Sequence, residues 1–352
     1  MLNPITNLLE TKYDYVWKSL IRPPRDKYKI SDLGSSKFKI ACNNYKRRDF
    51  QLYNKRKMRI ECSFWEPFEE ERKCARLPVI IYLPGNSSSR IEVVPLLSYI
   101  LPMNITVFAF DPCGSGLSEG EYISLGYHEK NDVKTVLNYL KESNKVSTIG
   151  LWGRSMGAVT AILSAKDNNN LNIINCICLD SCFSSLNKLV NEYVNHVVPY
   201  LPNFLIEIIK KYVSDIIEKK VNMRIEKIEP IKDAEFCSNI SALFCHAIDD
   251  KFIYKEHSKD LYEKYAGEKE IIMFNGGHNT KRPVHVLQII ALFFFDKLKV
   301  DNLEFISKQY DNRFNHDDEH NDDDDVGDEE FKYSSVNSIN VKNDIMSYFE
   351  TI

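Results

Sequence analysis

The chain has 352 residues, a formal net charge of −4 at pH 7, and 43% hydrophobic and 12% aromatic residues. It is long enough for one large domain with extensions and a substantial core, and its composition is that of an ordinary globular protein. The first dozen residues carry charges and lack the apolar stretch of a secretory signal, and the apolar run Val286–Phe295 is too short to span a bilayer. The sequence therefore predicts a cytoplasmic protein.

Apolar runs and helical patterns alternate between about residues 57 and 298. The predicted strands are Met58–Phe64, Val79–Leu83, Ile105–Phe110, Ser147–Trp152, Ile173–Leu179, Ala242–Cys245 and Glu270–Phe274. Helical patterns follow at 91–100, 127–142, 156–166, 255–265 and 283–298. This alternation predicts an α/β fold, with a mostly parallel, doubly wound sheet and helices on both faces.

The chain divides into an N-terminal extension (1–56), a main domain (57–304) and an acidic tail (305–352) for which we expect disorder. Within the main domain, about 60 residues after Asp180 show no strand pattern, which predicts a helical cap insert at about 183–238. Its apolar residues recur at i, i+4 spacing, as in an amphipathic helix: Phe204, Leu205, Ile208, Ile209, Tyr212, Val213, Ile216 and Ile217. The insert either packs on the domain or caps the site, and the two roles are compatible.

Charge is distributed unevenly along the chain. Residues 311–330 hold eleven acids and one arginine, which leaves about +6 on the rest. A basic cluster near the N-terminus comprises Arg22, Arg25, Lys46, Arg47, Arg48, Lys55, Arg56, Lys57 and Arg59. It predicts either peripheral contact with an anionic membrane or a solvated surface facing the acidic tail. We expect no nucleic acid partner.

Neither the cysteines nor the acidic tail predicts a metal site. Nine cysteines in a chain without an export signal are read as reduced thiols, and Cys176 and Cys178 alternate as core residues of a strand would. The run DDDDVGDEE fails as a calcium loop because Val326 stands where the third oxygen ligand is needed. No cofactor is expected.

Two segments match G-x-S-x-G, the pattern of a nucleophilic serine on a strand–turn–helix elbow. Ser155, in GRSMG, follows an apolar run and precedes a helical pattern, and its glycines allow a strained turn and close helix packing. Ser118, in GLSEG, lies in a loop-like stretch with Pro112 and three glycines. Ser155 is therefore the candidate nucleophile.

A serine nucleophile needs a general base, a carboxylate that orients the base, and oxyanion donors. After the predicted strand Ala242–Cys245, the segment HAIDDKFI offers Asp249 and Asp250. After the strand Glu270–Phe274, NGGHNTKRP offers His278 on a glycine-rich turn. Serine, acid and histidine thus follow in the order of one triad class, each at the carboxyl end of a strand.

The oxyanion donors are expected to be two backbone N–H groups. One belongs to Met156, directly after the nucleophile, and the other to the loop that follows an earlier strand, LPGNSSS. In that loop Gly85 permits close approach of the backbone and Asn86 is the favoured donor, with Ser87 as the less favoured one.

At these motifs, over roughly residues 15–298, the chain resembles α/β-hydrolases of the serine aminopeptidase-like (hydrolase-4) type, which include peptidases, lipid esterases and protein-depalmitoylating thioesterases. The resemblance is carried by WKSLIRPPR, YLPGNSSSR, FDPCGSGLSEGEYISLG, LWGRSMGAVTA and HAIDDKFI…GGHNTKRP. It implies that Asp250 is the acid, with Asp249 as second choice, and that Ser118 shapes a loop beside the site. Where the family usually has His-Gly-Asn, this chain has Pro84, which bears on loop support more than on catalysis.

The predicted function is hydrolysis of an ester, thioester or amide of an acyl or lipid-like substrate, or of an acylated protein, through an acyl-enzyme. All three bonds pass through the same tetrahedral oxyanion, so the motif does not separate an esterase from a peptidase. A catalytically silent protein on the same fold is the remaining alternative, because fold does not imply activity. A dinucleotide site is excluded because Glu119 stands where G-x-G-x-x-G needs its third glycine.

Overall fold

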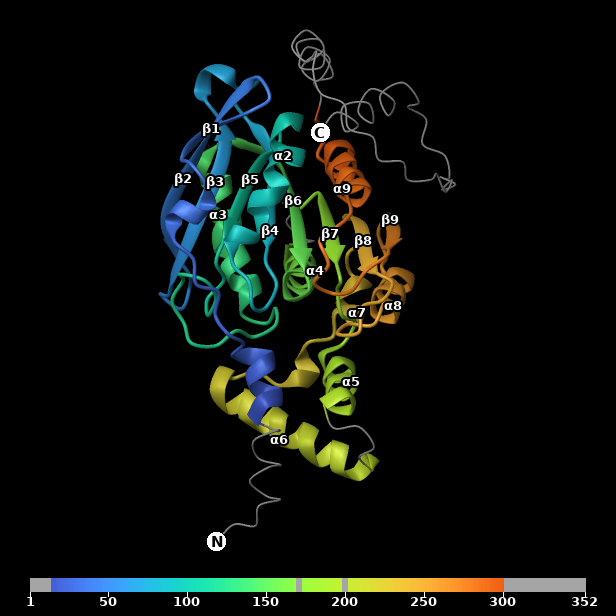
Figure 1. Ribbon diagram of the computed structural model, residues 1–352. Helices are drawn as coiled ribbons and strands as arrows, with labels where there is room; N and C mark the ends of the chain where they lie inside the picture. Colours follow the sequence, from blue (N-terminus) through green and yellow to red (C-terminus); the bar gives the residue numbers. More distant parts are fainter. Residues whose placement is uncertain (1–13, 169–172, 198–201, 301–352) are drawn as a thin grey trace, which may run out of the picture.

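In the computed structural model, residues 14–168, 173–197 and 202–300 are described, and the acidic tail lies outside them. A nine-stranded sheet of order β1-β2-β3-β5-β4-β6-β7-β8-β9 forms the centre (Figure 1). Its strands are β1 Lys37–Ile40, β2 Asn43–Tyr53, β3 Arg59–Pro67, β4 Leu77–Leu83, β5 Thr106–Phe110, β6 Val146–Arg154, β7 Cys176–Asp180, β8 Ser241–Ala247 and β9 Lys269–Phe274. Six neighbouring strands, β5, β4, β6, β7, β8 and β9, run parallel to one another. The strands β1, β2 and β3 add antiparallel pairs at one edge. The predicted mostly parallel α/β sheet is confirmed.

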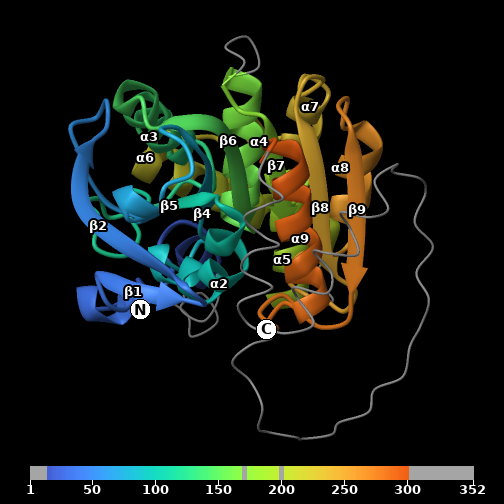
Figure 2. The same cartoon turned by 90° about the horizontal axis from the view of Figure 1, so that it is seen from above.

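Helices cover both faces of the sheet. Figure 2 shows α3 (Glu129–Ser143), α4 (Met156–Asn168), α7 (Pro230–Ala234) and α8 (Glu256–Lys264) on one side, and α2 (Leu97–Ile100) and α9 (Val284–Lys297) on the other. Each side has its own apolar cluster, and every residue of β4, β5 and β7 is buried. Strands covered on both faces are expected to be continuously apolar, as these are.

The helical pattern expected at 91–100 is largely a 3₁₀ helix. Arg90–Leu96 forms η3, and α2 adds only Leu97–Ile100 before η4 at Leu101–Met103. Pro95 lies inside η3 and has no N–H to donate, which disfavours a regular α-helix there. Two further short 3₁₀ helices, η1 (Ile30–Leu33) and η2 (Glu69–Glu71), lie in the connections before β1 and β4.

The N-terminal segment before residue 57 contributes β1 and β2 to the sheet, which the sequence pattern does not predict. Its described part also contains a helix over residues 14–21 whose apolar side is buried. Six members of the basic cluster bind other groups of the same chain: Arg25 binds backbone carbonyls, and Arg22, Lys46, Arg47, Arg48 and Arg59 form ion pairs. Lys55, Arg56 and Lys57 are exposed at the β2–β3 turn. Membrane contact by this cluster stays a prediction.

The insert is helical, and its first two helices lie beyond the carboxyl ends of the parallel strands, whereas α7 packs on one face of the sheet (Figures 1 and 2). It comprises α5 (Leu186–Val197), α6 (Asn203–Val221), η6 (Ile225–Lys227) and α7. The buried face of α6 consists of Ile206, Ile209, Val213 and Ile217, whereas Phe204, Ile208 and Tyr212 are exposed. The apolar stripe inferred from i, i+4 spacing therefore spans two faces, because that spacing alone does not say which row of residues meets the core.

Among the described residues, no helix has both the length and the apolar character needed to cross a membrane.

Candidate active site

Ser155 occupies the turn between β6 and α4. Its φ is +52°, in the left-handed region that non-glycine residues rarely adopt, and its N–H donates to the carbonyl of Asp180 at 2.7 Å. Gly157 is required by packing, since a Cβ there would collide with the backbone carbonyl of Leu83. The strained strand–turn–helix context expected of a nucleophile elbow is thus present at Ser155.

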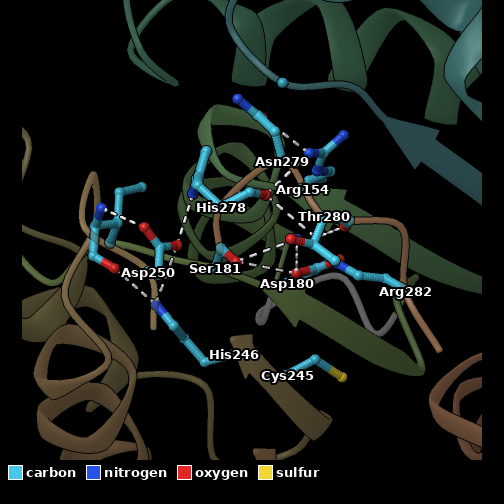
Figure 3. A network of polar contacts seen from close by, with 12 residues as sticks. Arg154, Asp180, Ser181, Cys245, His246, Asp250, His278, Asn279, Thr280 and Arg282 are labelled. Atoms are coloured by element: carbon cyan, nitrogen blue, oxygen red, sulfur yellow. Dashed lines mark hydrogen bonds and ion pairs between the residues drawn. The ribbon is translucent and has the colours of Figure 1, made fainter. Parts of the chain in front are cut away.

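Asp250 and His278, which come from two different loops, are brought together. His278 Nδ1 lies 2.7 Å from Asp250 Oδ2 (Figure 3). Asp250 follows β8 and is buried, and His278 follows β9 and is partly buried. Asp249, by contrast, is exposed. The histidine therefore meets the second of the two candidate carboxylates.

The electrostatics of this pair fix the tautomer of His278. Burial would raise the pKa of Asp250, but hydrogen bonds from His246 and His278 outweigh it, and the pKa is well below the usual carboxyl range. Two backbone N–H groups, of Phe252 and Ile253, also donate to Oδ1 at 2.9 and 2.8 Å. An ionised carboxylate only accepts, so His278 donates from Nδ1 and leaves the lone pair of Nε2 available as a base.

Arg154, the residue before Ser155, ties three loops around the elbow. It forms an ion pair with Glu92, and Glu92 accepts the N–H of Gly85 at 3.2 Å. Its other guanidinium nitrogen donates to the carbonyl of His278 at 3.1 Å and to Asn279 at 3.2 Å. The loop proposed for the oxyanion, the elbow and the histidine loop are therefore held side by side. Among the residues that the structure describes, Ser155 Oγ itself makes no hydrogen bond with His278.

The two expected oxyanion donors flank this elbow. Met156 is the first residue of α4, where backbone N–H groups have no partner within the helix. A Cβ on Gly85 would lie 4.0 Å from the carbonyl oxygen of Arg154, so the loop of Asn86 lies beside the elbow. The side chain of Asn86 donates to the carbonyl of Ser19 in the N-terminal helix at 3.4 Å, so this helix also borders the site.

Ser118 has a different setting. It is buried in the loop after β5, where its hydroxyl donates to the carbonyl of Asp111 at 2.6 Å and accepts the N–H of Glu61 at 2.8 Å. Arg25 donates to the neighbouring carbonyls of Ser115 and Gly116. Ser118 therefore has no strained turn and no adjacent histidine among these contacts, and it braces a loop.

A buried ion pair that the sequence pattern does not reveal anchors the histidine loop. Arg282 donates twice to Asp180, at 2.7 Å each, and once to the carbonyl of His278 at 3.2 Å. Both side chains are almost fully buried. Burial would raise the pKa of Asp180, but the charge and hydrogen bonds of Arg282 outweigh it and lower that pKa. The end of β7 is thereby fastened to the loop after β9.

We expect Arg282→Ala to destabilise the protein by about 3–5 kcal/mol, because it leaves a buried carboxylate without its partner. The measurement is urea unfolding at neutral pH. Since the pKa of Asp180 is lowered on folding, the pair contributes stability above the usual carboxyl pKa, and the difference between variant and wild type should shrink on acidification. Arg224→Ala, which removes an exposed pair with Glu218, is the control and should change nothing measurable. Equal behaviour of both variants would contradict the prediction.

The sequence places His246 too early in the chain for the general base and does not predict its contact with the acid, yet it is fully buried beside Asp250. Its place near the end of β8, three residues before Asp249 and four before Asp250, is the signal that the sequence offers. In the described ranges, no group of three or more His, Cys, Asp or Glu side chains is placed to hold a metal ion.

No family model matches the chain. Its sequence matches parts of curated proteins. YqkD, an uncharacterized protein of Bacillus subtilis (strain 168), is 32% identical over 130 residues, which are 35% of this chain and 42% of that protein. A monoglyceride lipase homolog of monkeypox virus is 32% identical over 115 residues, 32% of this chain and 40% of that protein. The matched region thus spans less than half the length of these relatives.

Solved structures match over most of the chain. An esterase of Pyrococcus furiosus, Pf2001, has a TM-score of 0.58 and 20% identity, covering 78% of this chain and 98% of that one. Est1E of Butyrivibrio proteoclasticus, solved with ferulic acid, has a TM-score of 0.55 and 14% identity, covering 71% and 99%. The acylaminoacyl peptidase of Pyrococcus horikoshii has a TM-score of 0.54 and 16% identity, covering 72% and 42%. By its sheet order, its elbow and this likeness, the chain is an α/β-hydrolase in fold, as its motifs predict.

Proposed function

We propose that the protein is a serine hydrolase in which Ser155 is the nucleophile, His278 the general base and Asp250 the residue that orients it. The observation that carries the proposal is the coincidence of a strained elbow serine, φ +52°, with a histidine held 2.7 Å from a buried carboxylate on the adjoining loop. Ser181, after β7, also has a positive φ of +55°, but its hydroxyl is bonded to Asp180 and Arg282 and no helix begins at the next residue, so it lacks the elbow. The proposal requires Ser155 Oγ and His278 Nε2 to come within hydrogen-bond reach when substrate binds, since catalytic contacts are often loose without substrate.

In the proposed mechanism, Nε2 of His278 takes the Ser155 hydroxyl proton as Oγ attacks the acyl carbonyl. The N–H groups of Met156 and Asn86 stabilise the oxyanion, and the N-terminus of α4 adds its positive dipole end. Collapse of the tetrahedral intermediate breaks the bond to the leaving group, to which His278 returns the proton. Water then attacks the acyl-enzyme by the same route. Every step uses a side chain or amide that already lies around the elbow, and no cofactor is required.

We propose an acyl ester or thioester as the substrate, with a lipid or an acylated protein as its source. Partial similarity to a monoglyceride lipase homolog and likeness in fold to esterases support this choice. A peptidase of the serine aminopeptidase-like type is the second candidate, and the fold likeness to an acylaminoacyl peptidase favours it.

The test is labelling of the wild-type protein by a fluorophosphonate, followed by kcat/KM on p-nitrophenyl esters of increasing chain length, an acyl thioester and an aminoacyl amide. Labelling with a preference for esters or thioesters is expected. A preference for the amide would move the protein to the peptidase branch. A protein that is folded but not labelled would be the catalytically silent alternative.

Aromatic side chains connect the cap to the catalytic base. The ring of Phe252 lies 5.1 Å from that of His278, and Tyr193 on α5 packs edge-on against Phe252 at 5.7 Å. The insert therefore reaches the site through α5, and we propose that Tyr193 and Phe252 form a wall of the acyl pocket.

If so, Tyr193→Ala should raise KM for long-chain esters by about tenfold or more while sparing acetate esters, because only a long acyl group contacts the lost ring. Steady-state kinetics across the ester series is the measurement. Ile208→Asn is the matched control, since Ile208 is 60% exposed on α6, and it should leave the preference unchanged. If folded Tyr193→Ala keeps the wild-type chain-length preference, Tyr193 and the cap do not line the acyl pocket.

A further inference from the structure

His246 is a second histidine in contact with the carboxylate of the proposed triad. It lies on β8, four residues before Asp250, and no part of it is exposed. Its Nε2 is 2.8 Å from the carbonyl of Ile253 and 3.5 Å from Asp250 Oδ2, the same oxygen that His278 contacts (Figure 3). Its Nδ1 is 2.7 Å from Ser258 Oγ. The imidazole is therefore held on both nitrogens.

The partners of His246 determine where its proton lies. A backbone carbonyl only accepts, so Nε2 must carry a proton in order to bond Ile253. That same N–H faces Asp250 Oδ2, an ionised oxygen that also only accepts. Ser258 has one hydroxyl proton and two neighbouring acceptors, Nδ1 of His246 and the carbonyl of Cys182 at 3.4 Å. Whether Ser258 donates to Nδ1 of His246 or to Cys182, the bond to Ile253 still requires a proton on Nε2 of His246, next to Asp250.

The geometry has a consequence for the loop that carries the acid. The hydrogen bond from His246 to the carbonyl of Ile253 joins the two ends of the loop 246–253, and Asp250 is part of this loop. Backbone N–H groups of Phe252 and Ile253 hold Oδ1, while His246 and His278 share Oδ2. Without His246, Oδ2 would be restrained by His278 alone, and the carboxylate could rotate out of line with the imidazole that it orients.

We propose that His246 is a positioning residue of the active site, which fixes Oδ2 of Asp250 for His278 through its Nε2–H. This inference rests on the proposed function and assigns a role to a residue that touches neither the substrate nor Ser155.

Two substitutions separate this role from simple core packing. In His246→Gln the side-chain amide nitrogen reaches the place of Nε2 and can still donate to Ile253 and face Asp250. In His246→Asn the shorter amide reaches only the place of Nδ1, near Ser258. Both variants remain polar and smaller than or similar to histidine, so the pair differs chiefly in the donor near Asp250.

We expect His246→Asn to lower kcat on p-nitrophenyl acetate by about 10–100-fold with little change in KM, as for other residues that orient a functional side chain through a hydrogen bond. His246→Gln should restore most of the kcat, and fluorophosphonate labelling rates should follow the same order. Equal losses in both folded variants, no loss in either, or a change confined to KM would overturn the proposal.

A measurement on the wild-type protein covers the case in which a variant does not fold. ¹⁵N-edited NMR of the histidine rings should show Nε2 of His246 protonated at every pH at which the enzyme is active. An unprotonated Nε2 would overturn the proposal without any mutation. If the wild type instead fails to react with fluorophosphonate, the proposed function fails, and the NMR result still reports separately on His246.

Discussion

Replacing Ser155 with Ala should abolish fluorophosphonate labelling and reduce ester hydrolysis by up to about 10⁶-fold, as loss of the nucleophile does in a well-studied serine protease. The physical reason is that Ser155 stands on the strained turn that leads directly into α4. Ser181 also has a positive φ, of +55°, but its hydroxyl donates to Asp180 and accepts from Arg282, and no helix begins at the residue after it. The substitution removes only the Ser155 hydroxyl, which makes no hydrogen bond with His278 in the structure, so the fold should be unchanged. Circular dichroism and the unfolding midpoint check this.

Ser118→Ala is the matched control because Ser118 also lies in a G-x-S-x-G segment. It removes a buried hydroxyl that bonds Asp111 and Glu61, so a loss of about 1–3 kcal/mol in stability is expected. Labelling should persist. Loss of labelling in Ser118→Ala together with retention in Ser155→Ala would overturn the choice of nucleophile.

The elbow could be predicted from the sequence because its requirements are local. A buried strand, two glycines that clear the backbone of a following helix, and a serine between them all lie within a dozen residues of Ser155. The same holds for the candidate acid and base, since each follows an apolar run that reads as a strand. Seven predicted strands correspond to β3–β9, and the fully buried parallel strands among them, such as β4 and β5, are nearly continuously apolar.

Features that depend on distant partners could not be predicted in this way. The strand β2 reads NNYKRRDFQLY, and its charges look like a solvated segment until Arg47 binds the carbonyl of Gly34 and Arg48 pairs with Glu66. The Arg282–Asp180 pair joins residues 102 positions apart. The i, i+4 spacing in α6 does not identify its buried face, because its partner surface is formed by other parts of the chain. Contacts of this kind are set by tertiary packing, which sequence periodicity does not encode.

The choice between Asp249 and Asp250 shows the same limit on a smaller scale. The residues alone leave both open, because the two are adjacent and both follow β8. Neighbouring residues on a tight turn point in different directions, so one faces His278 and the other faces solvent. The structure puts Asp250 under His278, where it is buried, and leaves Asp249 exposed with its N–H bonded to the carbonyl of Gly276 at 3.0 Å.

Asp250→Asn is therefore expected to lower kcat by up to about 10⁴-fold, the loss seen when a triad carboxylate is replaced in the well-studied protease case. An amide in this place can donate to Nδ1 of His278, which would favour the wrong tautomer and remove the lone pair that Nε2 needs to act as a base. The substituted side chain also loses the charge that stabilises the imidazolium. The measurement is kcat on p-nitrophenyl acetate.

Asp249→Asn supplies the comparison, since it makes the same chemical change one residue away on an exposed side chain. Its kcat should stay within about tenfold of the wild type, because its side chain does not touch His278 and the backbone bond to Gly276 is kept. Equal rates in the two variants would contradict the assignment of Asp250. The converse order would place the acid on Asp249 and require the loop to rearrange when substrate binds. The predicted order follows from one contact, the 2.7 Å bond between Asp250 Oδ2 and His278 Nδ1, which makes this pair of variants a direct test of whether that bond is catalytic.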